Sequence, residues 1–89
     1  MSGNKNVHYK SDEYMSRSQL ASFLRTLADR IESGTVVLTR NDDETRVEIG
    51  EQVELEVQYE TKHKPKGARH QLELEIEWGE GAGGGVGLA

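Results

Sequence analysis

The sequence contains no cysteine, one proline and no long apolar run among its 89 residues. Without cysteine there is no disulfide framework, thiolate nucleophile, iron–sulfur cluster or cysteine-based zinc site. No apolar run approaches the roughly 18 residues that a membrane-spanning helix needs. The N-terminal stretch also lacks the apolar segment of a secretory signal. We therefore expect a cytoplasmic protein that makes no contact with a membrane.

Charge is abundant but unbalanced, with 30% charged residues and a formal net charge of −5. This acidic balance argues against nucleic-acid binding by the whole surface, although a local basic patch remains open. A chain of this length forms one domain with a modest core. By composition the chain divides into an N-terminal arm (1–15), a periodic domain (16–78) and a glycine-rich tail (79–89), which we expect to be flexible.

The periodic domain begins with a predicted amphipathic helix. Ser16 and Gln19 have the spacing of a capping box. Gly34 is a typical C-terminal stop. Apolar residues recur at helical spacing between them, at Leu20, Phe23, Leu24, Leu27, Ala28 and Ile31. One face of this helix must therefore be covered by another part of the protein.

After the helix the apolar pattern changes to a period of two, which predicts four strands. The short connections favour antiparallel pairing. The pairs that keep apolar residues on one face are Leu38–Val47, Ile49–Val53 and Leu55–Ile76. The loops that these pairs imply are centred on residues 42–43, 50–52 and 64–67.

These elements predict an α+β fold in which one helix packs across a four-stranded antiparallel meander. Residues Val7–Tyr9 could add a short N-terminal strand. The margin of stability is thin, because ordering each residue costs about 1–2 kcal/mol of backbone entropy. A homodimer that covers an edge strand is therefore one expectation.

The order of these features resembles the amphi-Trp domain family, in which a short helix precedes amphipathic strands and a final strand closes on a tryptophan. The matching stretches are MSRSQLASFLRTLADRIESGTVVL (Met15–Leu38), VELEVQYE (Val53–Glu60) and LELEIEW (Leu72–Trp78). The basic third turn and the glycine-rich tail depart from the family pattern. The resemblance implies a small stand-alone prokaryotic domain of unknown function and supplies no catalytic residues.

One candidate surface is an acidic outer face of the predicted sheet. Its candidate residues are Glu48, Glu54, Glu56, Glu75 and Glu77. The expected registers place Glu48, Glu54 and Glu77 in one row, and Arg46, Glu56 and Glu75 in the next. Like charges directly opposite each other destabilise a sheet mildly, so the charge could serve a basic protein partner or divalent cations. The alternative is a solvated face that keeps the protein soluble.

A second candidate surface is the basic third hairpin. Its candidate residues are Lys62, His63, Lys64, Lys66, Arg69 and His70. This cluster could contact phosphates or an acidic partner, more strongly when its histidines are protonated. The alternative is a turn that protects the strand edges from aggregation. The two histidines alone do not make a metal site, which needs three or four converging ligands.

Trp78 ends the last predicted strand on the apolar side, where we expect it to anchor the core; the alternative is that it lines a small groove. No catalytic constellation or phosphate loop is present, and we expect no cofactor and no metal. We expect a non-enzymatic module that binds an unknown protein partner or a second copy of itself, through the acidic face or an exposed strand edge. The alternative is weak binding of nucleic acid or another anion by the basic hairpin.

Overall fold

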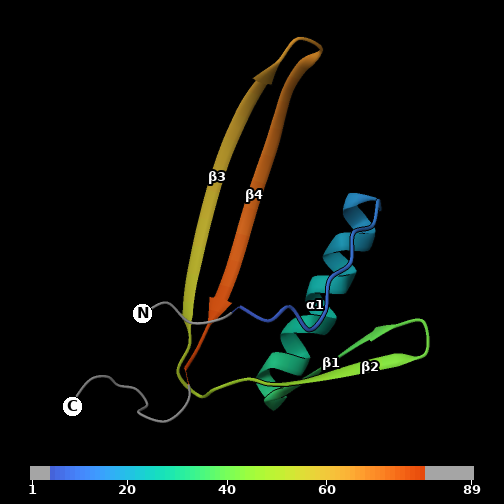
Figure 1. The fold of residues 1–89 in the computed structure, drawn as a ribbon, viewed down its shortest axis with the longest axis vertical. Coiled ribbons are helices and arrows are strands. Elements are labelled where there is room, and N and C mark those ends of the chain that lie inside the picture. Colours follow the sequence, from blue (N-terminus) through green and yellow to red (C-terminus); the bar gives the residue numbers. More distant parts are fainter. Residues whose placement is uncertain (1–4, 80–89) are drawn as a thin grey trace, which may run out of the picture. The chain divides into compact units, whose positions relative to one another are not determined.

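The computed structural model describes residues 5–79 and divides the chain into two compact units, 1–49 and 50–89. The chain is α+β, with one helix and four antiparallel strands in its described part (Figure 1). Within residues 5–79, no helix has the length and apolar character needed to cross a membrane. The glycine-rich tail predicted at 79–89 lies, beyond Gly79, outside the described residues.

In the first unit, the helix α1 (Arg17–Ser33) begins and ends at the predicted signals. The backbone N–H of Gln19 donates to Ser16 Oγ at 3.0 Å, and that of Ser16 donates to Gln19 Oε1 at 2.9 Å. At the other end, Gly34 adopts a left-handed φ of 98°, a conformation that costs glycine nothing. Its N–H donates to the carbonyl oxygens of Arg30 and Ile31. Each end is thus fixed by local hydrogen bonds.

The hairpin of β1 (Thr35–Arg40) and β2 (Asp43–Glu48) follows the helix. The expected pairing of Leu38 with Val47 is wrong by two residues, because Val36 lies opposite Val47. This register leaves a two-residue turn in which Asn41 adopts a φ of 56°. Asparagine tolerates this left-handed region better than most residues. Both registers keep the same residues on each face, so parity could not separate them.

Unit 1 packs its helix against β1. Val36 is the one buried hydrophobic residue in the described part of the chain, with 7% of its surface exposed. Leu27, Ile31 and Val47 are half-buried. The C-terminal half of helix α1 therefore covers the short hairpin. Leu20 and Phe23, near the start of the helix, remain exposed.

The N-terminal arm adds no strand within residues 5–16, so the expectation of a strand at Val7–Tyr9 is wrong. Side chains make the connection instead of a backbone ladder. The Tyr9 hydroxyl donates to the Thr39 carbonyl oxygen at 2.8 Å, and Arg40 Nη1 donates to the Lys10 carbonyl oxygen at 3.1 Å. These two bonds hold the arm to the end of β1.

In the second unit, β3 (Glu54–Lys64) and β4 (Gly67–Glu77) form one hairpin with strands of 11 residues (Figure 1). The predicted pair Leu55–Ile76 is confirmed, and Lys64 lies opposite Gly67 across the predicted turn. Gly67 has a φ of 125°, which L side chains rarely adopt.

The single four-stranded sheet is not formed in residues 5–79, where β1–β2 and β3–β4 are separate two-stranded sheets. The expected pairing of Ile49 with Val53 is therefore absent there. The Ile49 N–H instead donates to the Gly34 carbonyl oxygen at 2.8 Å, inside the first unit. This bond continues the β1–β2 register one position beyond the Thr35–Glu48 pair.

Candidate protein-interaction site

The long hairpin carries two chemically different faces, because side chains alternate along a strand and opposite partners share a face. One of them, the apolar hairpin face, consists of Leu55, Val57, Tyr59, Leu72, Leu74 and Ile76. These six side chains are between 37% and 67% exposed. Within the second unit, no described residue covers them.

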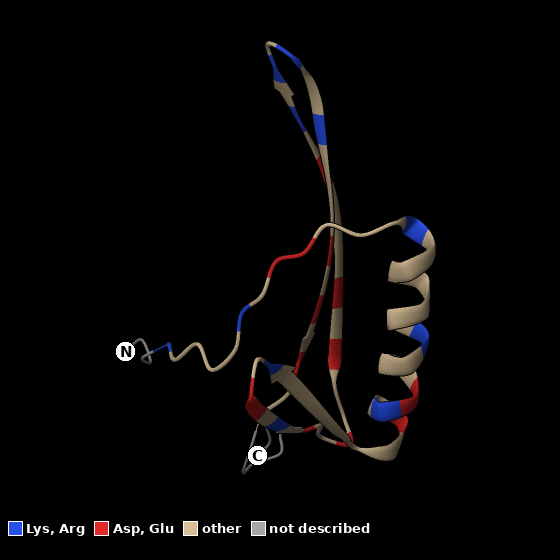
Figure 2. Ribbon diagram, turned by 90° about the vertical axis from the view of Figure 1, so that its right-hand side faces the viewer, with Lys and Arg blue, Asp and Glu red and all other residues tan. Residues whose placement is uncertain are grey.

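The opposite side, the charged hairpin face, is divided by sign along its length. Near the chain ends of the hairpin Glu54 lies opposite Glu77, and Glu56 lies opposite Glu75. Near the turn Lys62 lies opposite Arg69, with Lys64 one step further. Figure 2 shows this order, with basic residues gathered towards the turn and acidic residues further down the strands. Acidic and basic residues therefore occupy opposite ends of one surface.

The predicted acidic rows are only partly present. The two glutamate pairs of the long hairpin lie as predicted, but Glu48 and Arg46 belong to β2 in the other unit, and β2 does not pair with β3. Glu48 accepts hydrogen bonds from Arg46 Nε at 2.8 Å and from Thr35 Oγ1 at 2.9 Å. Both bonds lower the pKa of the Glu48 carboxyl, and the bond from Arg46 has the larger effect. Within residues 5–79, Glu48 thus has local side-chain partners that the other four glutamates lack.

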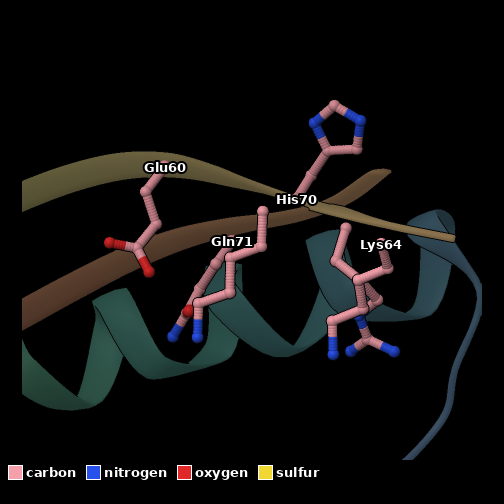
Figure 3. Close-up of a pocket in the computed structure, with 6 residues that line it drawn as sticks. Glu60, Lys64, His70 and Gln71 are labelled. Atoms are coloured by element: carbon pink, nitrogen blue, oxygen red, sulfur yellow. The ribbon is translucent and has the colours of Figure 1, made fainter. Parts of the chain in front are cut away.

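The predicted basic hairpin is also divided between the faces. Lys62, Lys64 and Arg69 lie on the charged hairpin face, whereas His63 and His70 have the parity of the apolar face. Figure 3 shows the His70 ring on the opposite side of the strands from Glu60, Gln71 and Lys64. Lys66 lies in the turn. The lysines and histidines therefore differ in the face that their parity assigns, although His70 borders the same hollow as Lys62, Lys64 and Arg69.

Two further features of this end were not predicted. A shallow hollow of about 480 Å³ is lined by Glu60, Lys62, Lys64, Arg69, His70 and Gln71 (Figure 3). On the apolar side, the Tyr59 hydroxyl lies 2.8 Å from His70 Nδ1, and the two rings are nearly parallel with centroids 6.0 Å apart. The alternation that continues through Thr61 is the sequence signal that could have placed His70 beside Tyr59.

Trp78 follows β4 directly and is half-buried. Its indole lies against the backbone of Gly50, where an added Cβ would be 3.1 Å from Trp78 Cδ1. Glycine at position 50 thus lets the indole approach the backbone closely, a role that the turn prediction missed. A shallow recess at this end is lined by Gln52, Val53, Glu54, Glu77, Trp78 and Gly79. Trp78 closes the base of the hairpin.

The first unit has a hollow of its own, of about 410 Å³, between the arm, the start of α1 and β1. Met15, Leu20, Phe23, Val37 and Leu38 supply its apolar lining. Across residues 5–79, no three His, Asp or Glu side chains converge as a metal site would require. Large hydrophobic residues are thus exposed in both units, and the long hairpin combines them with a charged face on its opposite side.

The sequence model that describes the Amphi-Trp domain matches residues 2–88. The match covers nearly the whole chain, including the arm and the stretch after Trp78. No curated protein and no solved structure matches the chain. The chain belongs to the Amphi-Trp domain family.

Proposed function

We propose that this Amphi-Trp domain is a small, non-enzymatic protein-interaction module of the prokaryotic cytoplasm, and that its β3–β4 hairpin makes the contact. The observation that carries the proposal is the apolar hairpin face, whose six large side chains are 37–67% exposed. Contiguous exposed apolar surface is typical of protein–protein contacts. The absence of cysteine supports a reducing compartment.

The edges of the hairpin add to this argument. In residues 5–79, β3 and β4 each pair with a single strand, so each has a free edge of backbone N–H and C=O groups. A free edge can accept an extended strand from a partner, with backbone hydrogen bonds giving affinity and side chains giving specificity. An isolated two-stranded hairpin is only marginally stable in water. Binding therefore stabilises the hairpin as well as the complex.

Non-enzymatic function is supported by the openness of the same surfaces. The four carboxylates at the acidic end of the charged hairpin face, Glu54, Glu56, Glu75 and Glu77, are exposed to solvent. General acid–base catalysis uses groups held in a site that excludes water and fixes their geometry. An open face suits recognition by charge and shape better than it suits catalysis.

Site-specific photo-cross-linking in native cells tests the proposal. A benzophenone amino acid is placed at Val57 on the apolar hairpin face and, separately, at Arg25 on the helix. We expect a discrete protein adduct from position 57 and none from position 25. Equal labelling from both positions, or none from either, contradicts the proposal.

A pair of neighbouring substitutions provides the matched control. Val57→Thr keeps the shape and strand propensity of the residue but adds a hydroxyl to the apolar face. Gln58→Thr places the same side chain one residue away, on the charged face. A cross-linker at Leu74 should lose most of its adduct in the Val57→Thr variant and keep it in the Gln58→Thr variant. Loss in both variants would point to general destabilisation of the strand.

The basic end of the hairpin favours a second function, weak binding of nucleic acid or another anion. Lys62, Lys64 and Arg69 line one hollow together, and only Glu60 opposes them in charge there. If each of these three cations neutralises one phosphate of duplex DNA, counterions are released from the DNA. A plot of the logarithm of the binding constant against the logarithm of the salt concentration then has a slope of about −2.7. The faces that carry Tyr59 and the lysines are opposite, so this end lacks a base-stacking aromatic among its cations.

A gel-shift titration over a range of salt concentrations tests this second function. The binding constant should fall with rising salt concentration at the slope given above. Binding should disappear when Lys62, Lys64 and Arg69 are replaced by alanine. The His63→Ala variant is the control, because its side chain has the parity of the other face. No shift with the unmodified protein at low salt contradicts nucleic-acid binding.

A further inference from the structure

The order of charges along β3 is complementary to itself when the strand is reversed. Glu54 and Glu56 lie at one end of the strand, and Lys62 and Lys64 lie at the other, each pair on the charged hairpin face. Two copies of β3 placed antiparallel would therefore bring opposite charges together. We propose that a second copy of this chain pairs along the free edge of β3, an inference that rests on the proposed protein-interaction function.

The pairing has one full-length register. It places Tyr59, the centre of the 11-residue strand, opposite Tyr59 of the partner copy on a two-fold axis. Glu54 then lies opposite the partner's Lys64, and Glu56 opposite the partner's Lys62. The two-fold axis repeats both contacts, so the interface holds four pairs of opposite charge and none of like charge.

Other registers of β3 against a second copy bring like charges together or place unlike faces side by side. A shift by two residues in one direction places Glu56 opposite the partner's Glu60, and in the other direction it places Glu60 opposite its own copy. A shift by one residue sets the apolar face of one copy beside the charged face of the other. Parallel pairing brings each charge against its own copy. Charge and parity together select the centred antiparallel register.

The same test applied to β4 gives a weaker result. Centred on Leu72, an antiparallel copy of β4 pairs Arg69 with Glu75 of the partner and leaves Glu77 opposite Gly67. That interface holds one type of opposite-charge contact where β3 holds two. The strand β3 is therefore the edge that the charges favour.

Pairing along β3 also relieves a cost inside each hairpin. Glu54 faces Glu77, Glu56 faces Glu75, and Lys62 faces Arg69 across the β3–β4 ladder. Like charges directly opposite each other destabilise a sheet. In the dimer, each of these β3 residues gains an opposite charge on its other side. The arrangement that is unfavourable in one copy becomes balanced in two.

The product is a four-stranded sheet in the order β4-β3-β3-β4, with one continuous apolar face. A sheet needs three or more strands with an apolar face to be independently stable, and the sheet of the dimer has four. An extended edge pairing of this kind is a known route of strand recognition between chains. The second copy thus supplies what a single hairpin lacks, namely more strands and balanced charge.

Two charge-reversal variants test the register. The acidic variant carries Lys62→Glu and Lys64→Glu, and the basic variant carries Glu54→Lys and Glu56→Lys. The acidic variant removes one like-charge pair within its own hairpin, and the basic variant removes two, so we expect each variant to fold. Each also sets four like-charge pairs across the interface with its second copy, so its self-association should weaken at least about tenfold.

Mixing the two variants restores all four pairs of opposite charge. In the mixed dimer, the glutamate of each pair comes from the acidic variant and faces a lysine of the basic variant. By light scattering, the unmodified protein and the equimolar mixture should have twice the chain mass of 9.9 kDa. Each variant alone should have the mass of one chain. A monomeric unmodified protein, dimeric single variants, or a mixture that stays monomeric each overturns the proposal.

A cysteine pair gives a second readout that does not depend on charge, since the chain contains no native cysteine. Directly opposite residues lie about 4.5–5.5 Å apart, within disulfide reach. With copper phenanthroline as oxidant, Tyr59→Cys should form a covalent dimer, and Leu72→Cys, its neighbour on β4, should not. Equal cross-linking of both overturns the β3 edge. Should that happen while the Val57 photo-adduct persists, the interaction function stands and only the self-pairing fails.

Discussion

The two hairpins of this chain are built from the same alternating pattern but differ in what covers them. The β1–β2 hairpin has strands of 6 residues and lies against helix α1, which leaves Val36 with 7% of its surface exposed. The β3–β4 hairpin has strands of 11 residues, and no described residue of its own unit covers its apolar face. On the function proposed above, the short hairpin stabilises the fold and the long hairpin makes the contact with a partner.

The largest expected effect compares one residue type in the two hairpins. Val36→Ala should lower the free energy of unfolding by about 1.5–3 kcal/mol, because a buried valine loses its apolar contacts. Val57→Ala, at a side chain that is 57% exposed, should change it by less than about 0.5 kcal/mol in the monomer. Urea denaturation at low protein concentration measures both. Equal losses would show that the two hairpins are equally covered.

A smaller effect is expected at the base of the long hairpin, where Trp78 lies against Gly50. Gly50→Ala places a Cβ 3.1 Å from Trp78 Cδ1, so the indole must shift. We expect a loss of about 1 kcal/mol, at the low end for overpacking because Trp78 is only half-buried. The emission of this single tryptophan should move to longer wavelength. Gly79→Ala is the control, since nothing lies within 4 Å of its added Cβ, and an equal change in both variants would argue against the contact.

The smallest effect concerns the ion pair of the short hairpin. The hydrogen bond from Arg46, followed by that from Thr35, lowers the pKa of Glu48 in the folded protein. The stabilisation is therefore present above the pKa of the unfolded chain and is lost as the pH falls through the folded pKa. In Arg46→Ala, the Glu48 pKa should rise towards its ordinary value, as a carboxyl carbon NMR titration would show. An unchanged midpoint would mean that Arg46 does not hold Glu48 in solution.

Local signals and long-range pairing differed in how far the sequence could predict them. Ser16, Gln19 and Gly34 define both ends of the helix through contacts between near neighbours, and the structure confirms them. The β3–β4 register was also predictable, because Pro65 and Gly67 mark a turn between two long alternating strands. Family membership, which the order of these elements had suggested, is likewise confirmed.

The errors arose where the pattern did not limit the answer. Alternation determines which face a residue takes but not which of several registers pairs two strands, so Leu38 was placed opposite Val47 instead of Thr45. Asn41, a residue suited to positive φ, was the available clue to that turn. The short 50–52 connection suggested a β2–β3 turn, but Gly50 instead makes room for Trp78. Because of that error, Glu48 was assigned to a row of glutamates on the other hairpin.

Hydrogen–deuterium exchange at several protein concentrations tests the central claim, that the long hairpin is the binding element and the short one the structural element. Amides of β3 should become more protected as the concentration rises through the dimerisation range, because a second copy covers their free edge. Amides of β1 and β2 should exchange at the same rate throughout. Concentration-dependent protection of β1 and β2, with none in β3, would contradict the account.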